Sequence, residues 1–297
     1  APADTTPVNP KDDGFWGNTI TVINNIADKV LNLTLKDVKI DVSDTGRENH
    51  AGKAALSVQG KGNVEIELDG KNELKSGYYR AGLEKTSAGT LTLKDNKEAG
   101  SGSLNAEGGA LSAGIGGSYN DYSANNGTKN IIITGSTVTA TGGDGGAGIG
   151  GGNGGAAENI TITGGTVNAT GGWGGAGIGG GSSGSGENIT INDGKVTATG
   201  GSYAAGIGGG GVGAWGGDAG SGWGGAGIGG GGDGRNSDSN GKNITITGST
   251  VTAKGGNGSA GIGGGVAGIG EAITITGSTV TATGGIGAAG IGGGCGG

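Results

Sequence analysis

The stretch that decides the fold is Asn159-Ile-Thr-Ile-Thr-Gly-Gly-Thr-Val-Asn-Ala-Thr-Gly-Gly172. Ile160 and Ile162 alternate with threonines, and then Val167 and Ala169 alternate with polar residues. A period of two is the pattern of a half-buried β-strand. A Gly-Gly pair follows each run, and paired glycines permit the positive φ angles of sharp corners. The stretch therefore predicts two short strands, each ending at a corner.

The same unit recurs along the chain, which is the signature of a repeat architecture. Clear copies begin at Asn130, Asn159, Asn188 and Asn243, and a last copy has Ala272 in place of asparagine. Each copy is followed by Ala-Gly-Ile-Gly-Gly, which predicts a third short strand with glycine on its outer side. The isoleucines of this unit are Ile149, Ile178, Ile207, Ile262 and Ile291. The step from Ile149 to Ile178 and from Ile178 to Ile207 is 29 residues, one coil of a three-sided solenoid.

The pattern continues toward the N-terminus with charged residues on the outside, as in Val64-Glu-Ile66-Glu-Leu68. About eight coils are expected. Residues 1–130 carry 31 charged side chains and the longer remainder carries 12, so the coils after about residue 130 are the more regular ones. We expect a polar N-terminal tail over residues 1–17, a single β-helix domain over 18–297, and an insertion at about 210–225.

Glycine accounts for 83 of the 297 residues, so the supply of apolar side chains is too thin for a conventional globular core. One coil buries only four large apolar side chains, and ordering its backbone costs more than that burial provides. Stacked neighbours must therefore stabilise each coil. The recurring asparagines are expected to form an internal ladder, each bonding the next coil at a corner that tolerates unusual φ.

These units resemble the repeats of bacterial extracellular right-handed β-helix proteins of the carbohydrate-binding-domain class. They are similar to a clostridial cellulose- and pectin-binding β-helix family, over about residues 30–297. The resemblance implies an all-β, right-handed parallel β-helix, and the right-handedness of parallel crossovers agrees with it. It also implies a polysaccharide ligand and associates the family with bound calcium.

The composition limits which partners the protein can bind and indicates the cellular compartment in which it is expected. The net charge of -7 makes a nucleic-acid backbone an improbable partner, and no run approaches the 18 or more apolar residues of a membrane span. Cys295 is the only cysteine, so an internal disulfide is excluded. The polar, proline-bearing start is typical of what remains after signal-peptide removal, which favours a secreted or cell-wall-associated protein.

The residues offer little for catalysis, so the chain is expected not to be an enzyme. His50, the only histidine, lies in the charged loop from Asp44 to Lys53, and a catalytic triad would rest on it alone. Polysaccharide lyase chemistry is open by analogy of fold only, because the acids do not cluster and Arg47, Arg80 and Arg235 are dispersed. No cofactor is assigned.

Aromatic residues suggest a site because their flat faces suit sugar rings. Trp173 follows one corner Gly-Gly pair, Tyr203 follows the same pair one coil later, and Trp215 and Trp223 lie in the insertion. We expect these four rings to gather on one edge as a platform for polysaccharide or cell-surface glycan. An ordinary role in shielding glycine backbone is the alternative for them.

Two other functions compete with carbohydrate binding. The first is ice binding through Thr-x-Thr ladders such as Thr161 and Thr163, although threonine is also simply a good outward β residue. The second is a structural stalk or adhesin that self-associates through a flat face free of side chains. That face is expected to comprise Gly148, Gly150, Gly177, Gly179, Gly206 and Gly208.

Overall fold

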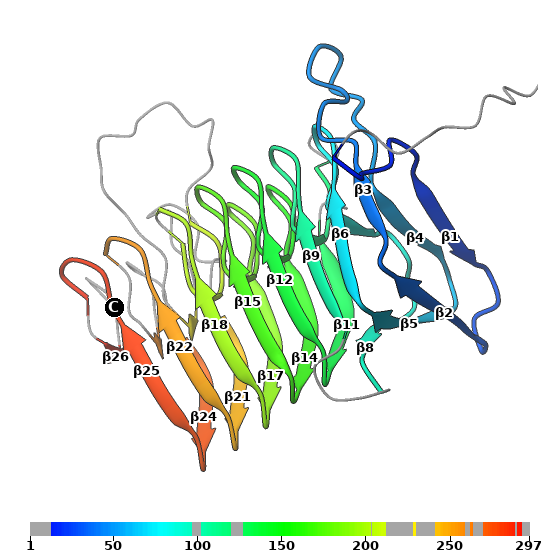
Figure 1. The fold of residues 1–297 in the computed structure, drawn as a ribbon. Coiled ribbons are helices and arrows are strands. Elements are labelled where there is room, and N and C mark those ends of the chain that lie inside the picture. The colour runs from blue at the N-terminus through cyan, green and yellow to red at the C-terminus, as the bar shows by residue number, and fades with distance from the viewer. Residues whose placement is uncertain are drawn as a thin grey trace, which may run out of the picture.

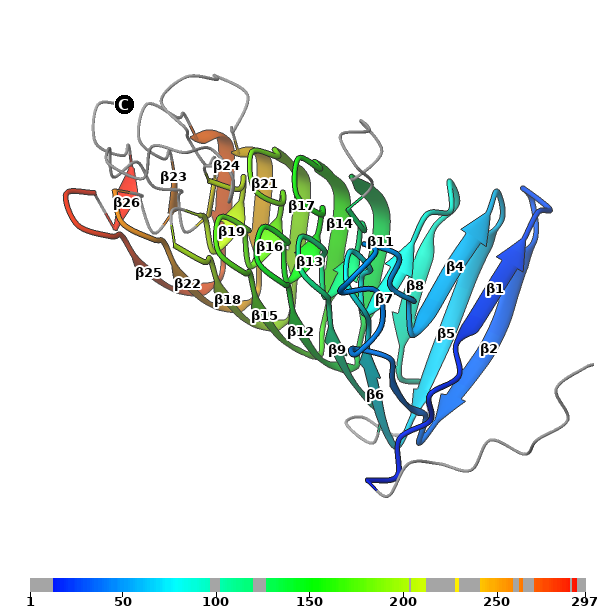
Figure 2. The same ribbon diagram turned by 90° about the horizontal axis from the view of Figure 1, so that it is seen from above.

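The chain winds into a parallel β-solenoid with three sheets along its length (Figures 1 and 2). The computed structural model describes residues 13–96, 102–119, 127–202, 204–211, 228–229, 241–258, 262–263, 270–288 and 290–292. Each complete turn adds one strand to each sheet, and the described elements are all strands. The predicted all-β, three-sided parallel fold is confirmed. Within these ranges, no helix is long and apolar enough to cross a membrane.

The first sheet is formed by the Ile-Thr-Ile-Thr segments and their charged equivalents. Its neighbouring strands pair in parallel, with Ile160 beside Ile189 and Ile189 beside Ile244. Its strands, in spatial order, are β2 (Val30–Lys36), β5 (Asn63–Asp69), β8 (Leu91–Lys94), β11 (Thr128–Thr134), β14 (Ala157–Thr163), β17 (Gly186–Asn192), β21 (Gly241–Thr247) and β24 (Gly270–Thr276).

The second sheet is formed by the Thr-Val-x-Ala-Thr segments after the first corner. Val138, Val167 and Val196 are register partners in successive turns. Its strands are β3 (Lys39–Asp41), β6 (Lys71–Lys75), β9 (Ser103–Glu107), β12 (Thr137–Thr141), β15 (Thr166–Thr170), β18 (Lys195–Thr199), β22 (Thr250–Lys254) and β25 (Thr279–Thr283).

The third sheet has two more strands than the others. One is β1 at its start, and the other is β20, which lies between β19 and β23 although β17 pairs directly with β21. The insertion therefore adds a strand to this sheet alone. The strands are β1 (Ile20–Asn24), β4 (Leu56–Gly60), β7 (Leu83–Lys85), β10 (Ile115–Gly116), β13 (Ile149–Gly150), β16 (Ile178–Gly179), β19 (Ile207–Gly208), β20 (Ile228–Gly229), β23 (Ile262–Gly263) and β26 (Ile291–Gly292).

The core is one continuous column of apolar side chains between the sheets. In the turn that begins with β14, Ile160, Ile162, Val167 and Ile178 are each fully buried. Burial of a Val, Leu or Ile side chain is worth about 1.5–3 kcal/mol. The hydrogen bonds between turns satisfy the strand backbones that carry these residues.

The asparagine ladder forms, but on the surface instead of inside the solenoid. The side-chain amide of Asn159 donates to Oδ1 of Asn130 at 3.1 Å, and Asn188 and Asn243 continue the series at the same distance. All four asparagines have positive φ, between 53° and 60°. The predicted bonding and φ are right, and the predicted interior position is wrong. At this bend the positive φ turns each amide outward, while Ile160 next to it faces the core.

The glycines of the third sheet do not form a bare face, which corrects the expectation of self-association through them. All six are buried. In the described turns from β10 to β19, the loop after one short strand hydrogen-bonds to the loop before the preceding short strand, as when the Ser182 amide donates to the Gly145 carbonyl at 2.8 Å. A Cβ on Gly179 would lie 1.8 Å from the Gly208 carbonyl oxygen. The stacked turns and the loops bonded to one another leave the six glycines buried, so these glycines do not present an open face.

The N-terminal segment joins the solenoid earlier than the sequence suggested. Phe15 is buried, and Lys39 and Lys75 lie 5.7 and 4.8 Å from its ring centroid. Trp16 forms a parallel bridge with Ile40 of β3. Phe15 and Trp16 therefore belong to the folded part of the chain and not to the expected tail.

Candidate functional site

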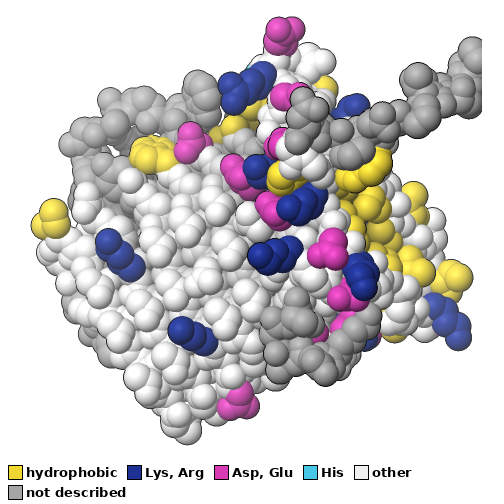
Figure 3. Space-filling model, in the orientation of Figure 1, with side chains coloured by type: hydrophobic (Ala, Val, Ile, Leu, Met, Phe, Trp, Pro, Cys, Tyr) yellow, Lys and Arg dark blue, Asp and Glu magenta, His cyan; other side chains and the backbone are white. Residues whose placement is uncertain are grey.

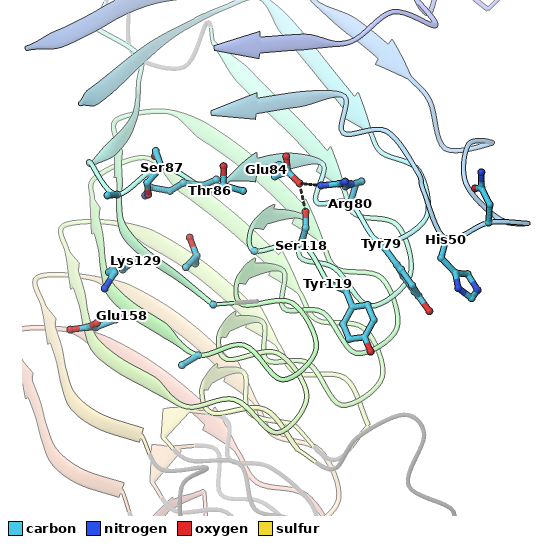
Figure 4. Close-up of a pocket in the computed structure, with 17 residues that line it drawn as sticks. His50, Tyr79, Arg80, Glu84, Thr86, Ser87, Ser118, Tyr119, Lys129 and Glu158 are labelled. Atoms are coloured by element: carbon cyan, nitrogen blue, oxygen red, sulfur yellow. Dashed lines mark hydrogen bonds and ion pairs between the residues drawn. The ribbon is translucent and has the colours of Figure 1, made fainter. Parts of the chain in front are cut away.

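A groove lies where the charged turns give way to the glycine-rich turns, and we call it the junction groove (Figure 4). Its volume is about 1010 Å³. The loops before β4 and β7 and the segment after β10 supply one end. The segment after β7, with the starts of β11 and β14, supplies the other. Ligand pockets commonly measure roughly 300–1,000 Å³, so the junction groove can hold a sizeable ligand.

Strand β7 departs from the glycine pattern of the later turns. Glu84 is the register partner of Gly116, and Gly116 is followed in the next turns by Gly150 and Gly179. Those glycines have φ between 129° and 142°, a conformation that side chains rarely adopt. Glu84 is not among the residues with positive φ. Ordinary β geometry therefore lets β7 carry polar side chains where later turns carry none.

Glu84 is the centre of a buried polar network in the middle of the groove. Its carboxylate accepts hydrogen bonds from the hydroxyls of Ser57 at 2.6 Å and Ser118 at 2.7 Å. Arg80 donates to it at 2.9 Å and also donates from Nε to the Gly52 carbonyl. Only 3% of Glu84 is exposed, and three donors compensate its charge. The network fixes the Arg80 guanidinium at the groove wall (Figure 4).

Four aromatic rings cluster beside one end of the groove. Tyr78 and Tyr79 have ring centroids 4.3 Å apart, and His50 lies 5.3 Å and 5.0 Å from them. Tyr119 meets Tyr79 edge-on at 4.7 Å. The rings come from the β3–β4, β6–β7 and β10–β11 loops. His50, Tyr79 and Tyr119 line the groove itself, and Figure 4 shows them along one side of it.

Tyr79 has a left-handed backbone conformation that recurs at the equivalent loop position of the following turns. Its φ is 64°. The equivalent residue in the next turn is Leu111, with a φ of 61°, and the two turns after that have Gly145 and Gly174, with φ of 82° and 78°. Gly145 and Gly174 each donate to the loop of the next turn, so the loop tips are stacked. Non-glycine residues at positive φ cost about 1 kcal/mol or more and concentrate at functional sites. Tyr79 and Leu111 therefore bear a backbone cost that the glycines of the later turns avoid.

Lys85 gives the opposite end of the groove a buried cation. Only 3% of the residue is exposed, and its ammonium donates to the Ser87 carbonyl at 2.8 Å. Burial, with a smaller contribution from Lys129, lowers the pKa of Lys85 to about 8. A charged amine kept in such surroundings is typical of functional sites.

Comparison with known proteins agrees with this architecture. Six segments match a family model described as a beta helix repeat, at residues 100–119, 131–153, 160–182, 189–211, 244–270 and 273–295. The chain is a β-helix repeat protein. No curated protein and no solved structure is significantly similar to it. The matched repeats are the glycine-rich turns, whereas most of the groove's polar and aromatic side chains precede them.

Only one of the four predicted platform residues of this β-helix repeat protein lies in the described part of the chain. Trp173 is half-buried at a loop tip equivalent to Tyr78. Three turns separate the two, or about 14 Å at roughly 4.8 Å a turn. Tyr203, Trp215 and Trp223 lie outside the described residues, so their gathering around Trp173 stays a prediction.

The sequence did not reveal the junction groove. His50 was expected to be an ordinary surface residue and Arg80 an isolated one, and both line the groove. The available signal was the Gly77-Tyr-Tyr-Arg80 loop, which occupies the place of Gly172-Trp-Gly-Gly175 in a later turn.

A metal ion would need several ligating side chains close together. Across the described residues, no group of three or more His, Cys, Asp or Glu side chains is placed to hold an ion. The side chains of this part of the chain therefore do not supply the acidic cluster that calcium prefers. Calcium binding, which the family resemblance implies, stays a prediction.

Proposed function

We propose that this protein is a non-catalytic, secreted or cell-surface module that binds polysaccharide in the junction groove. The observation that carries the proposal is the half-buried ring pair of Tyr79 and Tyr119 on the wall of a large polar groove. Sugar rings stack on aromatic faces, and their hydroxyls need fixed polar partners. The Arg80 and Glu84 network supplies such partners beside the rings.

Rigidity supports the same function. The groove is built on stacked strands, and its arginine is fixed by hydrogen bonds to Glu84 and Gly52. A site held in place before binding loses less entropy when the ligand arrives. Trp173 lies on the same loop edge, about three turns away, and extends the aromatic surface along a chain-like ligand.

A glycan array followed by pull-down on insoluble polysaccharide tests the proposal. We expect wild type to bind and Tyr79→Gly to lose about tenfold or more in affinity, because base stacking on aromatic rings sets a comparable scale of ~1–3 kcal/mol. Glycine suits the φ of residue 79, so the variant should keep its fold. Trp173→Ala is the matched control, with a smaller loss. Equal binding by Tyr79→Gly and wild type would place the site elsewhere.

A second candidate function is ice binding, which is favoured by threonines that are register partners in successive turns. Thr161, Thr190, Thr245 and Thr274 are consecutive partners along the first sheet. Ile132 precedes this ladder and Lys195 interrupts the neighbouring sheet. Thermal hysteresis, and its loss in Thr190→Tyr, would establish this function. A wild-type protein without hysteresis would remove it.

A further inference from the structure

We propose that the basic end of the junction groove binds an oxyanion carried by the glycan, either a carboxylate or a sulfate ester. The site consists of Lys85, Ser87, Thr128 and Lys129, all of which line the groove. The inference rests on the proposed function for the source of its ligand, and it specifies the substituent that the glycan must carry.

Two hydroxyls at this end lack the partners that buried polar groups normally have. Ser87 Oγ and Thr128 Oγ1 are buried without a hydrogen-bond partner, and each residue is only 6% exposed. Leaving such a group unpaired costs about 1–3 kcal/mol. Both residues line the groove, so a ligand there can accept from them. Two hydroxyl donors beside an ammonium match the oxygens of a carboxylate or sulfate.

The two hydroxyls belong to segments that lie side by side. The Asn130 side-chain amide donates to the Ala88 carbonyl at 3.4 Å, which joins the residue after Ser87 to the start of β11. Thr128 begins that strand, and its methyl group packs where Gly116 has no side chain. The missing Cβ at Gly116 thus makes room for Thr128 in the groove wall.

Lys85 has hydrogen-bonding capacity left for a ligand. Its ammonium has three donors, and one of them is used by the Ser87 carbonyl. Leu83 and Lys85 share the core side of β7, and Val58 is the register partner of Lys85. The lysine stem therefore starts among apolar residues, and the charged head ends at the Ser87 carbonyl, on the groove wall.

The charge of the groove opposes that of the whole protein. Its lining has three cations, Arg80, Lys85 and Lys129, against two carboxylates, Glu84 and Glu158. Glu84 is engaged by Arg80 and two serines. A local positive excess on a chain of net charge -7 is suited to attracting an anion.

The two ends fit different parts of one ligand. Figure 4 shows His50, Tyr79 and Tyr119 on one side and Ser87, Lys129 and Glu158 on the other, with Arg80 and Glu84 between them. A sugar ring stacked at the aromatic end places following units toward the lysines. The groove therefore selects a glycan with a charged substituent over the neutral equivalent.

Titration with small ligands tests the site directly. The protein is titrated with methyl glucuronide, glucose 6-sulfate and neutral methyl glucoside at constant ionic strength, and backbone amide shifts are recorded by NMR. We expect at least one charged sugar to shift residues around Lys85 and Thr128 and to bind about tenfold more tightly than methyl glucoside. The stronger of the two charged ligands identifies the oxyanion. Equal affinity for all three would overturn the proposal.

Variants separate the site from general electrostatics. Lys85→Met should weaken binding of the charged sugar about tenfold, and Ser87→Ala and Thr128→Val each about threefold. Lys195→Gln removes the same charge from an exposed position on β18 and should change nothing. A loss in Lys195→Gln as large as that in Lys85→Met would contradict a defined site.

The pH dependence gives an independent readout. Binding should weaken as the pH rises past about 8, where Lys85 loses its proton, and the bound anion should move that midpoint upward. Lys129, Arg80, Glu84 and Glu158 are the other charged groups lining the groove. An affinity that does not change between pH 7 and pH 10 would exclude Lys85 as the residue that binds the anion.

Two possible outcomes of these binding experiments separate the oxyanion site from the proposed polysaccharide-binding function. Binding of polysaccharide through Tyr79 with equal affinity for neutral and charged chains would refute the oxyanion site and leave the function intact. Binding of small anions at Lys85, with no polysaccharide retained, would support the site and refute the proposed function.

Discussion

The turns before and after residue 116 close the third side of the solenoid in different ways. In β7 the closure uses side chains, with Glu84 joined to Arg80, Ser57 and Ser118. In β10, β13 and β16 it uses backbone alone, with glycines packed against the carbonyls of the next turn. Figure 3 shows charged side chains gathered over the early turns and few over the later ones.

The difference separates a scaffold from a site. Backbone closure can repeat indefinitely because every turn presents the same surface to the next. Side-chain closure is specific to one place, and it leaves a groove where the two kinds of turn meet. Function is therefore expected at the boundary between the two regions.

The largest expected effect comes from placing a side chain into the backbone closure. Gly179→Ala should destabilise the protein by about 4 kcal/mol or more, because its Cβ would meet the Gly208 carbonyl oxygen at 1.8 Å. Gly164 is the control, since its φ is also positive but its nearest neighbour would be 3.9 Å away. Gly164→Ala should cost about 1 kcal/mol. Urea denaturation measures both, and equal costs would show that the contact is unimportant.

Removal of the side-chain closure should have the next largest effect. Glu84→Ala leaves the hydroxyls of Ser57 and Ser118 without their acceptor, which should cost about 2 kcal/mol. Glu73→Ala breaks a surface ion pair with Lys39 and should cost less than about 1 kcal/mol. Chemical denaturation of the two variants would refute the structural role of Glu84 if their midpoints coincided.

Removal of the buried cation should stabilise the fold. The pKa of Lys85 is lowered to about 8 from 10.5, so the unfolded chain binds more protons between those values. Stability should therefore rise with pH across this window in wild type. Lys85→Met should lack that rise and be more stable at pH 7 by about 1–2 kcal/mol. Unfolding at pH 7 and pH 10 checks this, and a less stable variant at pH 7 would contradict it.

The smallest expected effect comes from extending the surface asparagine ladder into the last copy of the repeat. Ala272 has a φ of 55° at the position that asparagine occupies in earlier turns. Ala272→Asn should add a hydrogen bond to Asn243 and stabilise by about 0.5–1 kcal/mol. Ala272→Gly is the control, because glycine adopts this positive φ without strain and adds no side-chain amide. Thermal unfolding that ranks the two variants equally would show that the ladder bond contributes nothing.

Sequence periodicity was sufficient for the fold because each repeat carries its own strand and corner signals. Ile160, Ile162 and Val167 were identified as core residues from alternation, and all are fully buried. Alternation could not reveal that loops cover the glycine side of the third sheet. The pattern of side chains along one strand does not show where the backbone of the neighbouring loops lies.

The groove was harder to predict because it depends on loops of unequal length. His50, Tyr79 and Tyr119 come from three successive turns, and the 29-residue step does not hold there. Their proximity follows only from the three-dimensional stacking of those turns. The scarcity of tryptophan drew attention to Trp173, whereas the described ring cluster is made of tyrosine and histidine.

Hydrogen exchange with and without bound polysaccharide tests the central claim most directly, because it locates the ligand on the folded protein. The groove predicts that amides near Tyr79, Lys85 and Tyr119 exchange more slowly in the complex, while strands β15 and β18 of the second sheet are unchanged. Protection confined to the glycine-rich turns, with none around Tyr79 and Lys85, would contradict the account.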